Sequence, residues 1–192
     1  PRAKGTEGER MSMEADSIYS GASEKDILIS LEENDRGDTC KITLSPKRRF
    51  CTYRLKIINI ANQQNLSSSI AGSISGLAGG INLSTGEKTE AKVTVPFAVG
   101  TKNESTLEGQ LRCYGNSPSE DAANYLVIYT MLKDGTKWCY IYDVTKQIKE
   151  APNPYEVEIV LDKLPVPTKI GGNSGFTPGV SDWNIIEIPI GM

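Results

Sequence analysis

Residues 125–143 have the sequence YLVIYTMLKDGTKWCYIYD, and this stretch decides the fold class. Its first eight residues are almost wholly apolar, which is typical of a strand in the middle of a sheet. The Asp-Gly pair at 134–135 favours the tight turn of a β-hairpin. The returning segment places Trp138, Tyr140 and Tyr142 at every second position, so they share one face of a strand. The stretch therefore predicts an antiparallel hairpin.

Alternation of apolar and polar residues recurs along the rest of the chain. Runs of this kind lie at 27–31, 40–44, 48–60, 91–99, 107–113, 155–161 and 183–190. Only residues 143–149 favour a helix, a short one with Asp143 as its N-cap and Pro152 beyond its end. Because the strands follow one another without regular helices between them, we predict an all-β fold. We expect an antiparallel β-sandwich, or a barrel, of seven to nine strands with at most one short helix.

Three segments depart from simple alternation. Residues 70–80, IAGSISGLAGG, favour a strand with a bulge or a close backbone approach, because glycine is unfavourable inside helices. This segment also lacks the Gly-Lys-Ser/Thr ending of a phosphate-binding loop. Pro96, inside a strand pattern, indicates an edge strand or a bulge. The many prolines and glycines of residues 164–182 predict a long surface loop.

Composition narrows the function classes. The 192 residues are 38% hydrophobic and 23% charged, which is compatible with one packed domain. A net charge of −3 argues against a nucleic-acid binder, and no run approaches the roughly 20 apolar residues of a membrane span. The chain has no histidine, so histidine-based catalytic triads and histidine-liganded metal sites are excluded. We expect no enzyme activity, no cofactor and no metal, and we assign no catalytic residue.

The four cysteines are Cys40, Cys51, Cys113 and Cys139, and none of them forms a Cys-X-X-Cys pair. A zinc or redox motif is therefore not indicated. Four cysteines allow three disulfide pairings, and their spacing does not choose among them. Buried thiols that pack as small apolar residues are the preferred interpretation.

Two groups of side chains are candidates for ligand contact. Trp138, Tyr140 and Tyr142 can form a row on which sugars stack, although packing in the core is the favoured interpretation. The basic run at 47–49 can meet an anionic partner or lipid headgroups, although a solvated hairpin tip is favoured. The acidic residues of 32–38 lack the order of a calcium-binding loop.

Several segments taken together resemble one family. They are GTEGER at 5–10, ITLSPKRR at 42–49, IINI at 57–60, SSIAGSISGLAGG at 68–80, LSTGE at 83–87, YDVT at 142–145, IVLD at 159–162, GFTP at 175–178 and DW at 182–183. In this order they resemble the C-terminal domain of the fimbrillin-like surface lipoproteins of Bacteroidales. The resemblance is to the branch that holds fimbrial anchor and minor subunits.

The resemblance implies a fold and a role. It implies a transthyretin-like β-sandwich, which we place at 23–192. The charged, glycine-containing residues 1–10 predict a flexible arm, and the segment 1–22 is expected to hold this arm and a candidate first strand. The implied role is that of a non-enzymatic structural or adhesion protein, an anchor or accessory subunit in fimbria (pilus) assembly. The implied place is the cell outer membrane or the extracellular fimbria, with a signal peptide and lipid anchor upstream of Pro1.

The implied partners are other fimbrial subunits, bound by strand addition to an exposed sheet edge. The alternation at Met11 and Met13, or the terminal strand carrying Ile186, Ile188 and Ile190, can supply such a strand, although ordinary strands of this chain are preferred. The alternative function is a glycan- or protein-binding module of a surface lipoprotein. It would use the aromatic row or the glycine-rich segment 171–180.

Overall fold

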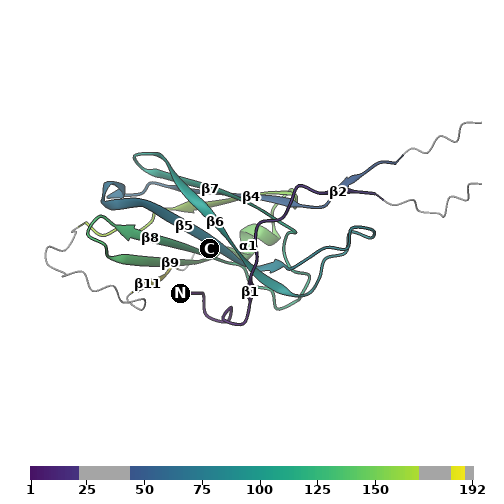
Figure 1. The fold of residues 1–192 in the computed structure, drawn as a ribbon. Helices are drawn as coiled ribbons and strands as arrows, with labels where there is room; N and C mark the ends of the chain where they lie inside the picture. The colour runs from purple at the N-terminus through teal and green to yellow at the C-terminus, as the bar shows by residue number, and fades with distance from the viewer. Residues whose placement is uncertain (22–43, 169–182, 189–192) are drawn as a thin grey trace, which may run out of the picture.

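A computed structural model describes residues 1–21, 44–168 and 183–188 of the chain. The architecture is all-β, as predicted, and the described residues include one short α-helix, α1 (Thr145–Lys149), and one 3-10 turn, η1 (Gln63–Asn65) (Figure 1). The strand expected at 27–31, residues 40–43 of the strand expected at 40–44, and the segment 171–180 lie outside the described residues.

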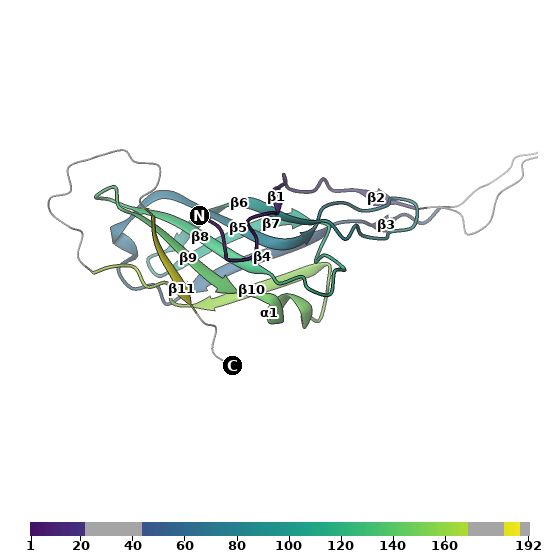
Figure 2. The ribbon, with the colours of Figure 1, turned by 90° about the horizontal axis from the view of Figure 1, so that it is seen from below.

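Eight long strands form one sheet in the order β10-β4-β7-β6-β5-β8-β9-β11. Their bounds are β4 (Cys51–Ile58), β5 (Leu66–Ala78), β6 (Lys92–Asn103), β7 (Thr106–Cys113), β8 (Tyr125–Leu132), β9 (Lys137–Asp143), β10 (Glu156–Asp162) and β11 (Trp183–Ile188). The short β1 (Arg10–Met11) pairs with β6 beside this path. Two further short strands, β2 (Tyr19–Ser20) and β3 (Lys47–Arg48), form a ribbon that projects from one end (Figure 2).

The sheet is mixed, which corrects the antiparallel prediction. β10 runs parallel to β4, β11 runs parallel to β9, and β1 runs parallel to β6, whereas the other pairs of the main sheet are antiparallel. The reason is topological: the chain leaves β9, passes through α1 and reaches β10 at the opposite end of the sheet. Alternation along a strand predicts which face is buried but says nothing about the direction of the neighbour.

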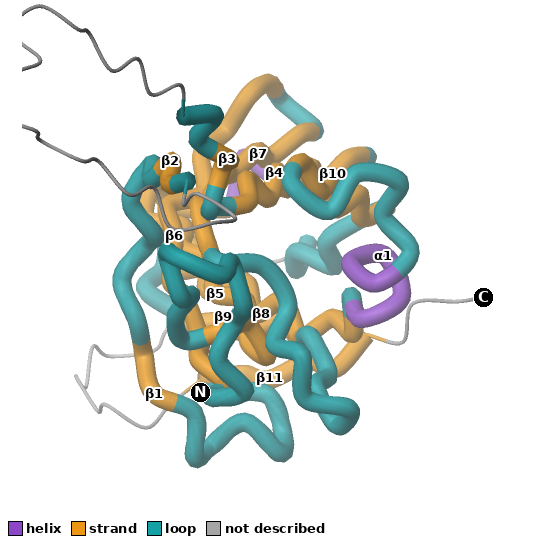
Figure 3. The backbone as a smooth tube through the Cα atoms, turned by 90° about the vertical axis from the view of Figure 1, so that its right-hand side faces the viewer, coloured by secondary structure: helices purple, strands orange, loops and turns teal. Residues whose placement is uncertain are grey.

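The sheet curls because β6 belongs to both of its halves. Residues 92–98 of β6 pair with β5, whereas Val99 and the residues after it pair with β7. Figure 3 shows the result end on, with β6 on one side and α1 on the opposite, open side between β10 and β11. Pro96 lies where β6 has left β1 and has not yet begun to pair with β7. On the side of β6 that faces away from β5, the N–H of Ser12 donates to the carbonyl of Thr94, two residues before Pro96. The N–H position of Pro96 points to this same side. The missing N–H of Pro96 therefore costs no ladder bond.

The space inside the curl is filled by apolar side chains from both halves. Ile57 and Leu107 come from β4 and β7, and Ile74 and Ile128 come from β5 and β8; all four are fully buried. The β8–β9 hairpin is confirmed, with Gly135 at φ 86° in its turn and antiparallel pairing on both sides. This burial is the main favourable term that holds the halves together.

A bulge interrupts β5, as its glycines indicated. The register of β5 against β6 shifts between Ile74 and Leu77, and Gly76 between them has φ +73°. A Cβ on Gly76 would lie 2.2 Å from the carbonyl oxygen of Ala123. The bulge turns the N–H of Gly76 toward the Glu9 carboxylate, which accepts it at 3.1 Å.

The N-terminal arm is docked along the sheet, which corrects the expectation of a flexible arm. Glu9 also accepts the Thr94 hydroxyl at 2.9 Å, and Arg2 donates to backbone carbonyls of residues 6, 7 and 9. Ala3 and Ala15 are buried. Charged residues suggested a solvated arm, but here their charges satisfy backbone groups within the arm and the bulge.

Replacing Gly76 by Ala should destabilise the protein far more than the same change at Gly135. Both positions have positive φ, which costs an L residue about 1–2 kcal/mol. A Cβ on Gly135 meets nothing within 4 Å, whereas one on Gly76 meets backbone and adds an overpacking cost of roughly 1–3 kcal/mol. Urea unfolding of the two variants measures the difference. Equal losses of unfolding free energy would contradict the proposed close approach at the bulge.

Candidate functional site

The candidate functional site is the edge of β10 beside α1, which is open in the sense that no further strand of the described residues pairs with it. The side-chain amide of Gln147 on α1 forms two hydrogen bonds with the backbone of Val160: it donates to the carbonyl at 3.2 Å and accepts from the N–H at 3.0 Å. A neighbouring strand would offer the same donor and acceptor. The side-chain amide of Gln147 therefore satisfies the backbone of Val160 as one residue of a neighbouring strand would.

The direction of the other backbone groups of β10 follows from its pairing with β4. Lys163 N donates to Ile58 O, and Tyr155 O accepts from Thr52 N, so the odd-numbered residues of this stretch face β4. Their even-numbered neighbours face the opposite way, as the Gln147 contact with Val160 shows. The N–H and carbonyl of Glu158 therefore point to the open side.

A groove of about 960 Å³ runs along this edge between α1 and β10. Its lining includes Gln147, Lys149, Glu150, Glu156 and Glu158. The groove thus presents backbone hydrogen-bonding groups together with charges of both signs.

Local sequence places α1 beside this edge. Ile148 is buried against the core, as is Val144 just before the helix. The N-cap position is Val144 and not the predicted Asp143, although the Asp143 carboxylate does accept the N–H of Thr145 at 2.9 Å. Burial of Ile148 leaves Gln147 on the side of α1 that faces β10.

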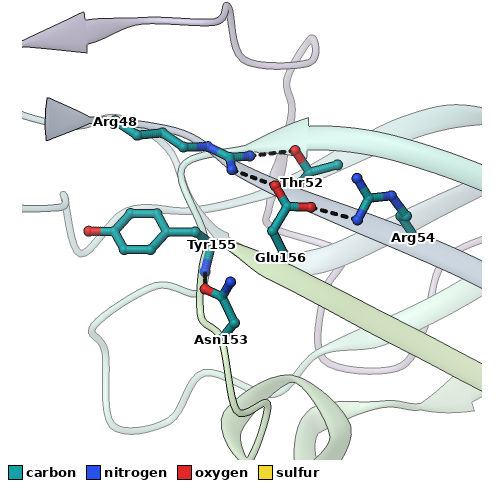
Figure 4. A network of polar contacts seen from close by, with 6 residues as sticks. All are labelled: Arg48, Thr52, Arg54, Asn153, Tyr155 and Glu156. Carbon is teal, nitrogen blue, oxygen red and sulfur yellow. Dashed lines mark hydrogen bonds and ion pairs between the residues drawn. The ribbon is translucent and has the colours of Figure 1, made fainter.

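Two arginines fix the beginning of β10 (Figure 4). The Glu156 carboxylate forms ion pairs with Arg48 and with Arg54, the latter at 2.6 Å. Arg48 also donates to the Thr52 hydroxyl at 2.6 Å and lies over the Phe50 ring, 4.1 Å from its centroid. Hydrogen bonding to Arg48, and then to Arg54, lowers the pKa of Glu156 below its ordinary value.

Tyr140 and Tyr142 of the predicted aromatic row are part of the core, which is the interpretation that the sequence favoured. Tyr140 and Tyr142 are buried, and their hydroxyls donate to the carbonyls of Pro165 and Lys163, each at 3.3 Å. Trp138 is half-buried and stacks on Tyr140, with ring centroids 6.3 Å apart. Burial raises the pKa of Tyr140 to about 12 and also raises that of Tyr142. These side chains attach the segment after β10 to the sheet.

Three cysteines are buried free thiols, as preferred from the sequence: Cys51, Cys113 and Cys139. Burial raises the pKa of Cys113 to about 12 and that of Cys139 to about 11, so both stay protonated at neutral pH. Cys40 lies outside the described residues. Within residues 1–21, 44–168 and 183–188, three or more metal-ligating side chains nowhere gather into a site. The same residues include no helix long and apolar enough to cross a membrane.

Sequence reasoning did not find the Gln147–Val160 contact or the pairing of Arg48 with Glu156. The predicted helix and strand were correct, but the two residues of the second pair are 108 positions apart. Neither pair leaves a local signal in one sequence.

Comparison with known families gives one match over half of the chain. A family model described as a domain of unknown function, DUF5119, matches residues 1–98 of the 192. The chain belongs to this family. Curated proteins provide no match.

Two solved structures are similar to the chain at low sequence identity. One is a protein from Bacteroides ovatus described as a candidate adhesin, with 16% identity and a TM-score of 0.49; the match covers 88% of this chain and 62% of that one. The other is the fimbrial anchor protein Mfa2 from Porphyromonas gingivalis, with 14% identity and a TM-score of 0.40; the match covers 70% and 48%. This DUF5119 chain spans less than two thirds of either.

Replacing Glu156 by Gln should lower the free energy of unfolding more at pH 7 than at pH 3. Arg48 and Arg54 hold the folded-state pKa of Glu156 below its ordinary value of 4.5. The ionised carboxylate therefore stabilises the fold above that pH, and this stabilisation is lost as pH falls through the folded-state pKa. Denaturant unfolding at both pH values measures the effect.

The matched control is Glu158→Gln, two residues along the same strand, where the described residues supply no ion pair. Its effect should be small at both pH values. A Glu156→Gln penalty that is the same at pH 3 and pH 7 would contradict the role given to the two arginines.

Proposed function

We propose that this chain is a non-enzymatic structural subunit of surface fimbriae, an anchor or accessory protein that binds other subunits by strand addition. The family to which the chain belongs has no assigned function, so the support comes from the sequence resemblance and from the edge of β10. On this proposal the protein acts at the cell surface, held through a lipid-anchored region upstream of Pro1. Its working parts are strand edges, and no side chain performs chemistry.

The observation that carries the proposal is the Gln147 contact at the free edge of β10. Natural sheets cover or charge such edges, because a row of unpaired N–H and carbonyl groups invites another strand. Here one amide side chain occupies the place of a strand at Val160, and the backbone N–H and carbonyl of Glu158 beside it have no partner among residues 1–21, 44–168 and 183–188. An incoming strand would replace Gln147 at Val160 and add bonds at Glu158.

The energies favour such an exchange. Each neutral hydrogen bond is worth about 1 kcal/mol net, so displacing Gln147 costs roughly 2 kcal/mol. A strand that pairs along β10 regains both bonds and adds further backbone bonds and side-chain contacts in the groove. The two hydrogen bonds of Gln147 thus protect the edge of the free subunit but are weak enough to be displaced.

The segments expected to donate a strand are used within this chain. Met11 belongs to β1 and pairs with β6, while Ile186 and Ile188 belong to β11 and pair with β9. Met13 is exposed, and Ile190 lies outside the described residues. The accepting edge of β10 is therefore the part of the exchange that we assign.

Replacing Glu158 by Pro should impair subunit assembly, whereas Glu158→Thr should not. Proline removes the N–H that points away from β4 and crowds the open side, but it leaves the β4–β10 ladder intact. Losing that bond and adding the clash costs roughly 1–3 kcal/mol, or about 10–100-fold in affinity between subunits. Threonine removes the charge but keeps the donor.

The test uses the full-length parent protein in cells, with fimbriae counted and measured by electron microscopy. Thermal unfolding of each purified variant checks that the fold is kept. Fimbriae of unchanged number, length and attachment in the proline variant would overturn the proposal. Loss in both variants would assign the effect to the charge of Glu158 and not to its backbone.

A further inference from the structure

A small pocket near the beginning of β4 gathers positive charge from separate parts of the chain. Its volume is about 120 Å³. Its lining is Arg48, Arg49, Cys51, Ile81, Gly86, Lys88, Tyr114, Pro154 and Tyr155. These residues come from four separate segments of the chain, so the fold and not the local sequence creates the cluster.

Two of the three cations have free hydrogen-bonding capacity. Arg48 is paired with Glu156, whereas Arg49 uses its Nε to bind the Ser20 hydroxyl at 2.8 Å. Within the described parts of the chain, the terminal nitrogens of Arg49 and the Nζ of Lys88 meet no acceptor. Five guanidinium donors and three ammonium donors make these groups the usual partners of oxyanions.

Two glycines hold these cations in place. Gly86 has φ +83°, and a Cβ there would lie 1.9 Å from Nη1 of Arg49. Gly115 has φ +85°, and a Cβ there would lie 2.5 Å from Nζ of Lys88. Each charged group thus occupies space that any other residue would fill. This close approach places both cations along the lining of the pocket, although Lys88 remains exposed.

The carboxylates near the pocket leave it positive. Glu156 is shared between Arg48 and Arg54, and Glu87 accepts the Thr85 hydroxyl within its own turn at 3.1 Å. At the pocket floor, Lys88 and Arg48 partly oppose the rise that burial causes in the pKa of Cys51. The positive charges of Lys88 and Arg48 therefore act on a side chain that lines the pocket.

We propose that this pocket binds the acid group of an anionic sugar, either a sulfate or a carboxylate. A volume of about 120 Å³ equals roughly four water molecules, enough for an acid group but not for a sugar ring. The ring then lies at the rim, where Tyr155 is 48% exposed. Figure 4 shows Tyr155 pointing away from the Glu156 ion pairs, so its ring is available for stacking.

The inference does not depend on fimbrial assembly, because the pocket does not use the open edge of β10. A Glu158→Pro variant that fails to assemble should still bind the sugar. The two proposals can therefore fail separately.

The experiment measures binding to the full chain by isothermal titration calorimetry. The probes are a sulfated heparin-type hexasaccharide, a hexagalacturonate, neutral maltohexaose, inorganic sulfate and a hexaglutamate peptide. We expect one of the two acidic sugars to bind, with affinity that falls as salt rises, because exposed charges are screened. Which of the two binds identifies the acid group.

Lys88→Gln should weaken binding of that sugar about tenfold, the effect of losing one charge-assisted contact. Lys88 is exposed, so this change should leave the fold intact, and thermal unfolding checks it. The control is Lys102→Gln, another exposed lysine, which is paired with Glu108 away from the pocket and should have no effect. Tyr155→Ala should weaken binding of the sugar but leave inorganic sulfate binding unchanged.

Four results would overturn the inference. The first is failure of both acidic sugars to bind, and the second is equal binding of neutral maltohexaose. The third is a Lys88→Gln variant that binds like the parent. Tighter binding of hexaglutamate than of either sugar would also overturn it, because the pocket would then serve an acidic peptide.

Discussion

The main constraint on this structure is that each edge strand of a sheet has backbone N–H and carbonyl groups without a neighbouring strand to bind. Among the described residues the curl does not close, so β10 and β11 each have a strand neighbour on one side only. Both are joined to the sheet in parallel, and the described connection from β9 to β10 passes along the open side. α1 lies in this connection, and its Gln147 binds the backbone of β10. The candidate site is thus a consequence of incomplete closure.

Much of the fold was predictable, because a strand with one buried face shows apolar residues at every second position of the sequence. The β8–β9 hairpin followed from the Asp-Gly pair at 134–135, and the bulge followed from a glycine-rich segment. Strand direction was not predictable, since alternation is the same for parallel and antiparallel neighbours. Docking of the arm was also hidden, because Glu9 finds its partners 67 and 85 residues along the chain.

Less of the site was predictable. Tyr140 and Tyr142 do share a face with Trp138, but alternation does not say whether that face meets solvent or a second layer. The curl supplies that second layer, so Tyr140 and Tyr142 lie in the core and Trp138 packs against it. The sequence indicated two of the three cations of the small pocket, Arg48 and Arg49, as part of the basic run at 47–49. It did not indicate Lys88, because this residue belongs to a separate segment of the chain. Interactions between distant segments depend on the topology, which one sequence does not reveal.

The sharing of β6 between the two halves also bears on how the chain folds. The strands of the two halves are interleaved along the chain, with β4, β7 and β10 in one half and β5, β8, β9 and β11 in the other, so neither half is a contiguous piece of the sequence. The region matched by the family model ends at residue 98, inside β6, immediately before the strand changes partner from β5 to β7. That point is therefore no domain boundary. Most of the pairings join distant residues, and such a topology folds slowly and as one unit once nearly the whole chain is available.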